Sequence, residues 1–423
     1  MNSRIGYALG AALAMALAAV APTSAAMAKK EEKAAKQAPL QLGDAVRKAL
    51  TPADAAIKAK NVAAAEAAVA SARSIAKTPD EQFVVAQFAI QTAQLSGDQT
   101  KVLAALDEMI TTGEAANRLT QADKAKYYWI QSYSAYQAKN YPKAEAAAKA
   151  AIANGSTEVD APAVLADSQS RQGKTAEAIA TLEQSMAART AAGQPVPSEF
   201  YGRGADMASR AKDPVSFAKI TTAWLAAYPD RQNWHDSLFI YRQIAAPTGE
   251  VDLDLLRLAR AIGVLPLAAQ SNYIDYALAV YLKFPNEAVS LLNEGITAGK
   301  LNPATSQNTR EILALSQPKL AADKASIPAA IAAAAKPTSG YKPTVTTGDL
   351  LYGYKDFAKA AEVYKLALAK PGADVQQANY KLGMALAQAG DKAGAKAALD
   401  QVTSGNYAVV AGYAKTWVAH PIP

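Results

Sequence analysis

The chain has 423 residues, of which 51% are hydrophobic and 7% aromatic, and its formal net charge at pH 7 is +7. It contains no cysteine and only two histidines, His235 and His420. The absence of cysteine excludes disulfides, thiolate zinc sites and a cysteine nucleophile, and two histidines are too few for a typical histidine metal site. We therefore expect no metal and no other cofactor. Basic and acidic residues are interspersed, so attraction to anionic wall or lipid groups would be weak, and nucleic-acid binding is not indicated.

The N-terminus has the features of a secretory signal peptide. Arg4 precedes an apolar run over residues 5–21, and the small-residue stretch A-M-A ends at Ala28. An uncleaved membrane anchor is the alternative, but the run falls short of the roughly 20 apolar residues that span a bilayer comfortably. We expect cleavage after Ala28, a charged leader over residues 29–40, and a mature protein that is periplasmic or secreted.

The rest of the chain has the pattern of a helical repeat array. Apolar residues recur at helical spacing in stretches separated by short turns, and no stretch shows the alternation typical of a strand. Turn signals recur roughly every 30 to 40 residues, a period that indicates stacked helical units. The expected divisions are a repeat array over 41–315, an alanine-rich helix and a Pro/Thr/Gly linker over 316–347, and a C-terminal repeat pair with a capping helix over 348–423.

The clearest unit lies near the C-terminus. Leu382 belongs to an apolar stripe on a first helix, which Gly390 ends, while Ala395 and Leu399 belong to the matching stripe of a second helix. The small residues Gly383 and Ala395 allow the two helices to approach closely. Neither helix can bury its stripe alone, so the pair must stack on its neighbours.

These residues resemble the tetratricopeptide repeat, whose pattern joins a Leu-Gly pair in the first helix to an Ala and a large residue four positions later in the second. Ala144 and Ala178 lie one family period of about 34 residues apart. The resemblance is closest over 81–190 and 348–402, and it implies an all-α, right-handed superhelical solenoid of helix hairpins. The residues that we expect to pack between helices are Ala144, Leu165, Ala166, Ala178, Leu182, Ala360, Tyr364, Leu382, Gly383, Ala395 and Leu399.

The same resemblance implies a concave groove lined by the first helix of each hairpin. The residues at or beside the groove positions of the family are Trp129, Tyr133, Tyr136, Asp167, Arg171, Tyr380 and Met384. Exposed aromatic rings in such a row would anchor the side chains of a bound peptide. An alternative register places the rings of 129–136 in the core, although Gln131 fits poorly at the position of a core leucine. Both interpretations remain open at this stage.

Short motifs suggestive of catalysis lack the context that catalysis needs. Ser74 begins an S-x-x-K motif, but the S-D-N and K-T-G elements of penicillin-binding enzymes are absent from the sequence. His235 precedes a carboxylate, yet the local pattern supplies no nucleophile. Asp252 and Asp254 lie on one helix and do not flank a substrate, so we expect them on a solvated surface.

The sequence therefore predicts a non-catalytic scaffold or adaptor that binds segments of other envelope proteins. One alternative is an enzyme of cell-wall metabolism in which the repeats position the substrate, and two converging carboxylates in a deep pocket would favour it. The other alternative is a purely structural spacer. The sequence does not determine the partner or the oligomeric state.

Overall fold

The computed structural model describes residues 39–422, and within that range its regular elements are all helices. The predicted signal peptide lies outside the described residues. The first helices are α2 (Asp44–Lys58), α3 (Val62–Ile75), α4 (Pro79–Ser96), α5 (Gln99–Ala115), α6 (Gln121–Gln137), α7 (Tyr141–Ala153), α8 (Ala161–Arg171), α9 (Thr175–Ala191) and α10 (Ser198–Arg210).

The second half of the chain continues with α11 (Pro214–Ala227), α12 (Arg231–Ala245), α13 (Gly249–Ile262), η1 (Leu265–Leu267), α14 (Gln270–Val280), α15 (Pro285–Thr297), α16 (Gln307–Ser316), η2 (Gln317–Lys319), α17 (Leu320–Ala335), α18 (Tyr341–Gly353), α19 (Phe357–Leu368), α20 (Val375–Gln388), α21 (Lys392–Asp400) and α22 (Tyr407–Ala419). No helix of residues 39–422 has both the length and the apolar character that crossing a membrane requires.

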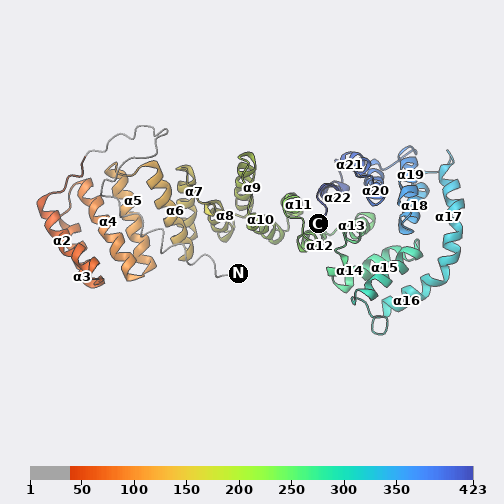
Figure 1. Cartoon of the computed structure of the whole chain (residues 1–423), viewed down its shortest axis with the longest axis horizontal. Coiled ribbons are helices and arrows are strands. Elements are labelled where there is room, and N and C mark those ends of the chain that lie inside the picture. The colour runs from red at the N-terminus through yellow and green to blue at the C-terminus, as the bar shows by residue number, and fades with distance from the viewer. Residues whose placement is uncertain (1–38, 423) are drawn as a thin grey trace, which may run out of the picture.

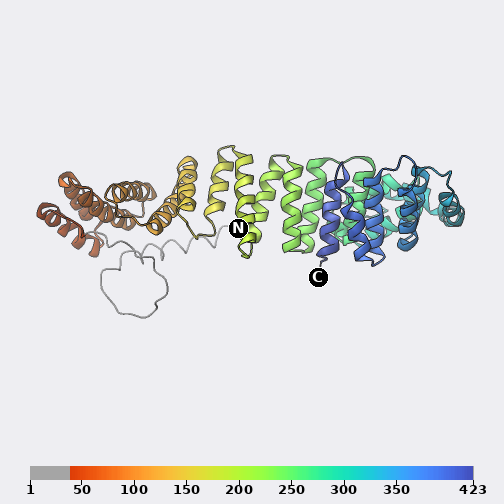
Figure 2. The same cartoon turned by 90° about the horizontal axis from the view of Figure 1, so that it is seen from above.

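Successive helices pack as hairpins, and the hairpins stack on one another, which confirms the predicted all-α solenoid. Helices α2 to α10 form an extended arm, and helices α11 to α22 form a ring (Figure 1). Viewed from above, the hairpins stand side by side along the whole molecule (Figure 2). In the ring, the chain runs outward to α17 and then returns, so that α22 packs on α11 and α13.

The hairpin of α20 and α21 shows how small residues set the spacing between helices. A Cβ atom on Gly383 would lie 2.5 Å from Cγ of Leu399, closer than two such carbons can approach. Gly390 ends α20 with φ of 90°, a left-handed conformation that costs glycine little. All the residues predicted to pack between helices are buried.

Capping interactions define where helices of the arm begin. The Thr78 side chain accepts a hydrogen bond from the backbone of Glu81, and the Glu81 carboxylate accepts one from the backbone of Thr78. Thr120 and Asp123 form the same reciprocal arrangement at the start of α6. The Glu81 carboxylate also accepts a bond of 3.1 Å from the backbone nitrogen of Gly43, which ties the start of α2 to α4. These caps satisfy backbone N–H groups at the starts of α4 and α6.

The predicted linker before the C-terminal repeats is shorter than expected. Residues 341–347 belong to α18, which begins at Tyr341, so only 336–340 separate it from α17. Pro343 lies in the first turn of α18, where its missing N–H removes no helical hydrogen bond. The predicted linker extended to residue 347 because proline is usually read as a helix breaker, but a helix tolerates proline at its start.

The final helix does more than cover the last hairpin. As predicted, α22 packs on α21, but it also packs on α11 and α13 from the middle of the chain. The hydroxyl oxygens of Thr221 and Tyr413 lie 2.7 Å apart and are buried. The ring of Tyr413 also meets that of Tyr241 at a centroid distance of 5.7 Å. The C-terminal part of the solenoid is therefore closed on itself.

Candidate functional site

An open groove with a volume of about 570 Å³ lies on the arm, where α6, α8 and α10 meet. These are the first helices of three successive hairpins. Tyr136 reaches the groove from α6, Asp167 and Arg171 from α8, and Arg203 and Arg210 from α10. Three of the seven residues predicted for the groove thus line one continuous surface, although they lie up to 35 positions apart in the sequence.

The groove is rich in guanidinium groups. Arg203 forms an ion pair with Asp167, and Arg210 forms one of 3.0 Å with Asp206. Arg171 has no ion-pair partner within residues 39–422. Burial raises the pKa of the Asp167 carboxyl above its ordinary value, although Arg203 and Arg171 act in the opposite direction. The surface therefore offers N–H donors to the carbonyl or carboxylate oxygens of a bound chain.

The predicted aromatic row combines features of both registers. Trp129 and Tyr133 are half-buried with their ring centroids 5.9 Å apart, and Trp129 packs against the core of the first hairpins. Tyr136 is half-buried and borders the open groove. Gln131 is buried, and its amide donates a hydrogen bond to the Asp107 carboxylate, which explains a polar residue at a core position.

Two predicted groove residues do not lie on an open surface. Tyr380 and Met384 of α20 are only 1% and 3% exposed, respectively. The Tyr380 hydroxyl donates a hydrogen bond of 3.1 Å to the backbone oxygen of Asp254 in α13. The expectation for these two residues was wrong because closure of the ring places α13 against the side of α20 that an open solenoid would expose.

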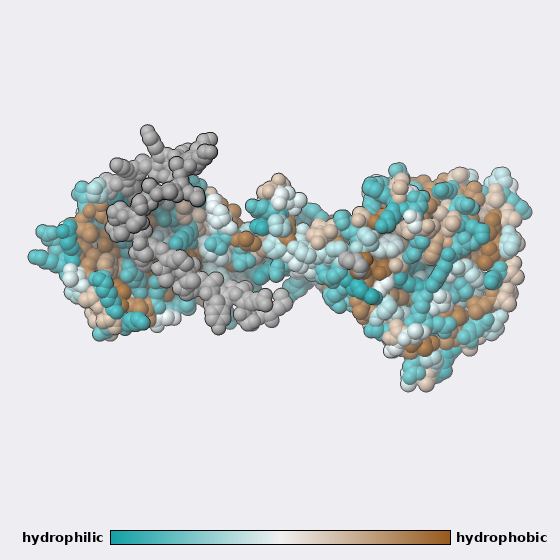
Figure 3. Space-filling model, in the orientation of Figure 1, coloured by the Kyte–Doolittle hydropathy of each residue, from teal (hydrophilic) through white to brown (hydrophobic). Residues whose placement is uncertain are grey.

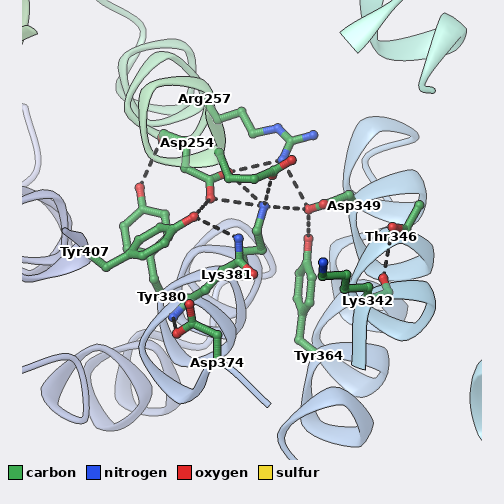
Figure 4. A network of polar contacts seen from close by, with 12 residues as sticks. Asp254, Arg257, Lys342, Thr346, Asp349, Tyr364, Asp374, Tyr380, Lys381 and Tyr407 are labelled. Atoms are coloured by element: carbon green, nitrogen blue, oxygen red, sulfur yellow. Dashed lines mark hydrogen bonds and ion pairs between the residues drawn. The ribbon is translucent and has the colours of Figure 1, made fainter. Parts of the chain in front are cut away.

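Closure of the ring also buries a cluster of five charged side chains, four of which, Asp254, Arg257, Asp349 and Lys381, are labelled in Figure 4. This buried charge cluster consists of Asp254 and Arg257 from α13, Glu287 from α15, Asp349 from α18 and Lys381 from α20, each no more than 4% exposed. Lys381 Nζ lies 3.0 Å from Asp254 Oδ2 and 2.9 Å from Asp349 Oδ1. Arg257 Nη2 lies 2.7 Å from Glu287 Oε2, and its Nη1 lies 3.1 Å from Asp349 Oδ1.

Buried tyrosines complete the hydrogen bonding of the cluster. Each of its three carboxylates accepts one phenolic hydrogen bond, from Tyr407 to Asp254 at 2.8 Å, from Tyr276 to Glu287 at 2.7 Å and from Tyr364 to Asp349 at 2.7 Å. A carboxylate removed from water needs such donors to offset its lost hydration. The cluster is thus satisfied by groups from α13, α14, α15, α18, α19, α20 and α22 together.

The charges of the cluster shift one another's protonation. Burial alone would raise the pKa of the Asp349 carboxyl, but Lys381 and Arg257 lower it below its ordinary value. Burial, with the nearby charges of Asp349 and Glu250, raises the pKa of Asp254. Burial lowers the pKa of Lys381 less than the two aspartates raise it, so the ammonium group stays charged. Two cations and three carboxylates meet in the cluster, and each carboxylate lies beside at least one of the cations.

The surroundings of the cluster leave little room for a substrate. A cavity of about 10 Å³ adjoins Asp254, Arg257 and Lys381. This volume holds at most about one water molecule. A larger cavity of about 220 Å³ lies beside Arg257 and is bordered by Glu287 and Glu294. Both glutamates are paired with arginines, so the carboxylates do not face the cavity as a free acid–base pair. The cluster therefore connects α13, α15, α18 and α20.

The other weighed motifs have ordinary structural surroundings. The hydroxyl of Ser74 donates a hydrogen bond of 2.8 Å to the backbone oxygen of Ser71. Nδ1 of His235 lies 2.8 Å from Oδ1 of Asp236, and its ring stands 4.9 Å from that of Phe239. Among residues 39–422, no group of three or more histidine or carboxylate side chains is arranged to hold a metal ion.

The sequence interpretation missed the charge cluster. The expectation that Asp254 lies on a solvated surface was wrong, because its side chain is buried. Asp252 is half-exposed and forms an ion pair of 2.6 Å with Arg242. One sequence signal for burial was available. Asp254 and Arg257 lie within the apolar run LDLLRLA, and if the surrounding leucines are buried on all sides of the helix, the charged residues between them are buried too. The identity of the partner Lys381, 127 positions away, had no local signal.

No protein-family model matches the chain, and no curated protein matches it. Among solved structures, a tetratricopeptide repeat protein from Parabacteroides merdae is 12% identical and aligns over 69% of this chain and 98% of its own, with a TM-score of 0.25. Yeast Tom70 is 10% identical and aligns over 88% of each chain, with a TM-score of 0.23. At TM-scores this low, the evidence for the solenoid is the hairpin packing of the chain itself.

Proposed function

We propose that this protein is a non-catalytic scaffold that binds an extended segment of another protein in the groove formed by α6, α8 and α10. The observation that carries the proposal is the groove itself, which is open, polar and lined by successive first helices. The rest of the solenoid supports it, because stacked hairpins give a long rigid surface on which a partner can lie.

The dimensions of the groove suit an extended chain. Neighbouring packed helices lie about 8–10 Å apart, so three of them span roughly 20 Å. An extended chain covers that distance with about six residues, since each residue advances it by about 3.3 Å. The arginines of α8 and α10 would bind oxygens of the segment, and the half-buried ring of Tyr136 would pack against an apolar side chain.

The cellular location belongs to the same proposal. The N-terminal sequence has the pattern of a secretory signal peptide, and a chain without cysteine suits an oxidising compartment. We therefore place the protein in the periplasm of a Gram-negative-type cell, where its partner would be another envelope protein. Fractionation of cells that express the intact chain would show the mature form in the periplasmic fraction, and a cytoplasmic product of full length would contradict this location.

Site-specific photocrosslinking in living cells tests the binding groove directly. A photoreactive amino acid replaces Ser170, which lines the groove, or, as a matched control, Ala188, which is exposed on α9. We expect discrete adducts with one or a few envelope proteins from position 170 and none of them from position 188. The absence of adducts at position 170, or identical adducts at both positions, would contradict the proposal.

Alanine substitution then separates the two interpretations of the aromatic row. If Trp129 and Tyr133 contact the partner, the variants W129A and Y133A bind it at least tenfold more weakly while helical content stays unchanged. If the rings serve the core, the variants lose thermal stability first, because truncating a buried aromatic residue costs about 3–5 kcal/mol. Circular dichroism on the same samples distinguishes these outcomes.

A further inference from the structure

Positive charge is concentrated at the outer end of the ring, although the composition of the whole chain is close to balanced in charge. Residues 317–373, from η2 to α19, contain eight lysines and four acidic residues, whereas the remainder of residues 39–422 contains 31 basic and 31 acidic residues. One of the four acidic residues is Asp349, which belongs to the buried charge cluster. Outside the buried charge cluster, this segment therefore has eight lysines and only three carboxylates.

Most of these lysines lack a counter-charge. Lys355 lies 3.4 Å from Glu294, and Lys359 lies 2.7 Å from Asp356. Lys370 donates a hydrogen bond of 2.8 Å to the backbone oxygen of Lys336, which brings the ends of α17 and α19 together. The lysines that are exposed and form no ion pair within residues 39–422 are Lys319, Lys324, Lys336, Lys342 and Lys365. We call these five residues the basic end.

Helix α17 carries Lys324 and lies between Lys319 and Lys336, all three of which belong to the basic end. Most of its other residues are apolar. It forms the outer edge of the ring, beside α18 and α19 (Figure 1), and only Ala334 of its residues is buried. Pro328 and most of its alanines are exposed, and Ile327 and Ile331 are half-buried. At this edge, hydrophilic residues alternate with more apolar ones (Figure 3). Lysines at both ends of an exposed apolar helix match the chemistry of a lipid–water interface.

We infer that the basic end docks the protein on a bilayer that contains anionic lipid. Lysines close to such a surface are attracted by its negative potential, and this attraction acts within about one Debye length. The exposed apolar face of α17 suits a lipid surface better than a polar protein partner, because it offers few hydrogen-bonding groups between the lysines. The helices that form the groove, α6, α8 and α10, lie in the arm, far from α17 (Figure 1). Docking through the basic end would therefore leave the groove free for a protein segment.

Sedimentation with vesicles tests this inference on the full chain. Vesicles of phosphatidylcholine with 30% phosphatidylglycerol are compared with vesicles of phosphatidylcholine alone, at low and high salt. We expect binding to the anionic vesicles that falls at least tenfold at high salt. Equal binding to both kinds of vesicle, or no binding to the anionic kind, would overturn the inference.

Charge reversal locates the surface. The triple variant K324E/K342E/K365E changes three lysines of the basic end, and the control K48E/K77E/K283E changes three exposed lysines elsewhere that also form no ion pair within residues 39–422. Both variants change the net charge equally. We expect the first to lose at least tenfold of the vesicle binding and the control to keep most of it. Equal losses would show attraction through overall charge and would overturn the inference.

A fluorescent label provides a second readout that does not depend on charge reversal. Because the chain has no cysteine, a single introduced cysteine carries the label alone. Ala325 of α17 and Ala104 of α5 are both exposed alanines and give matched sites for A325C and A104C. We expect anionic vesicles to shift the fluorescence emission maximum of the label to shorter wavelength only when the label is on α17. A shift from α5 alone, or from neither site in a sample that sediments with vesicles, would overturn the inference.

Discussion

Lys381 Nζ lies 3.0 Å from Asp254 Oδ2, although 127 residues separate the two in the chain. The pair joins α20 to α13 and closes the C-terminal part of the solenoid into a ring. The side of α20 that would otherwise face outward, with Tyr380 and Met384, is buried by this closure. The arm has no such closure, and its groove at α6, α8 and α10 stays open.

Removing the ammonium group of Lys381 should destabilise the ring strongly. The variant K381M leaves Asp254 and Asp349 buried beside one cation fewer, and breaking a buried pair on one side costs about 3–5 kcal/mol. The control K396M breaks the exposed pair with Asp400 and should cost less than about 1 kcal/mol. Urea denaturation of both variants measures the difference, and similar small losses would show that the cluster does not hold the ring.

Glu145 should make stability depend on pH in an acidic window. Burial acts to raise its pKa, but hydrogen bonds from Lys149, Lys174 and Gln172 lower it from its ordinary value of 4.5 to about 2. The resulting stabilisation is present above pH 4.5 and is lost as the pH falls through about 2.

The variant E145Q should therefore be less stable than the wild type at neutral pH, and the difference should shrink as the pH falls toward the lowered pKa. Thermal unfolding at a series of pH values checks this. A difference that stays constant with pH would mean that the pKa of Glu145 is not lowered in the folded chain.

Filling the space beside Gly383 should disrupt the contact between α20 and α21. The variant G383A puts a Cβ atom 2.5 Å from Cγ of Leu399, so the helices must separate, at a cost of about 1–3 kcal/mol. Gly202 gives a matched control, because its Cβ would meet Trp224 at an ordinary 3.6 Å. The variant G202A should be neutral or stabilising by up to about 1 kcal/mol. Equal effects of the two variants on the melting temperature would refute the close approach.

The hydroxyl of Tyr413 should contribute to closure separately from the charges. The variant Y413F keeps the ring in place but removes the 2.7 Å hydrogen bond to the buried Thr221 hydroxyl, which still donates to the Phe217 backbone oxygen, and this loss costs about 1 kcal/mol. Tyr281, whose hydroxyl has no hydrogen-bond partner within residues 39–422, gives the control Y281F. Urea denaturation should show a loss for Y413F only, and a loss for neither variant would mean that this hydrogen bond does not contribute to closure.

The hairpins could be predicted from the sequence because their determinants are local. Gly383 and Ala395 are spaced as two packed helices require, and both are buried as expected. Ring closure could not be predicted in the same way, because it depends on contacts such as that between Thr221 and Tyr413, which are 192 residues apart. Apolar periodicity identifies which side of a helix is buried and not which distant helix buries it.

The groove was predicted only where the solenoid stays open. Asp167 and Arg171 occupy the side expected from the repeat register, and the structure brings them together with Tyr136. Arg203 and Arg210 were missed because α10 carries a weak repeat signature, and Arg203 lies 36 positions after Asp167 rather than one family period of about 34. The same register extended to α20 failed for Tyr380, because a distant helix covers that side.

Thiol reactivity tests most directly whether the groove-facing side is open in the arm and covered in the ring. In this cysteine-free chain, S170C probes the arm and M384C probes the ring, each with a side chain close in size to the original or smaller. We predict that the thiol at position 170, a half-buried site on the open groove, reacts with a soluble maleimide in the folded protein, and that the thiol at position 384 reacts at least 100-fold more slowly than it until the protein is unfolded. Comparable rates at the two positions in the folded protein would contradict the account.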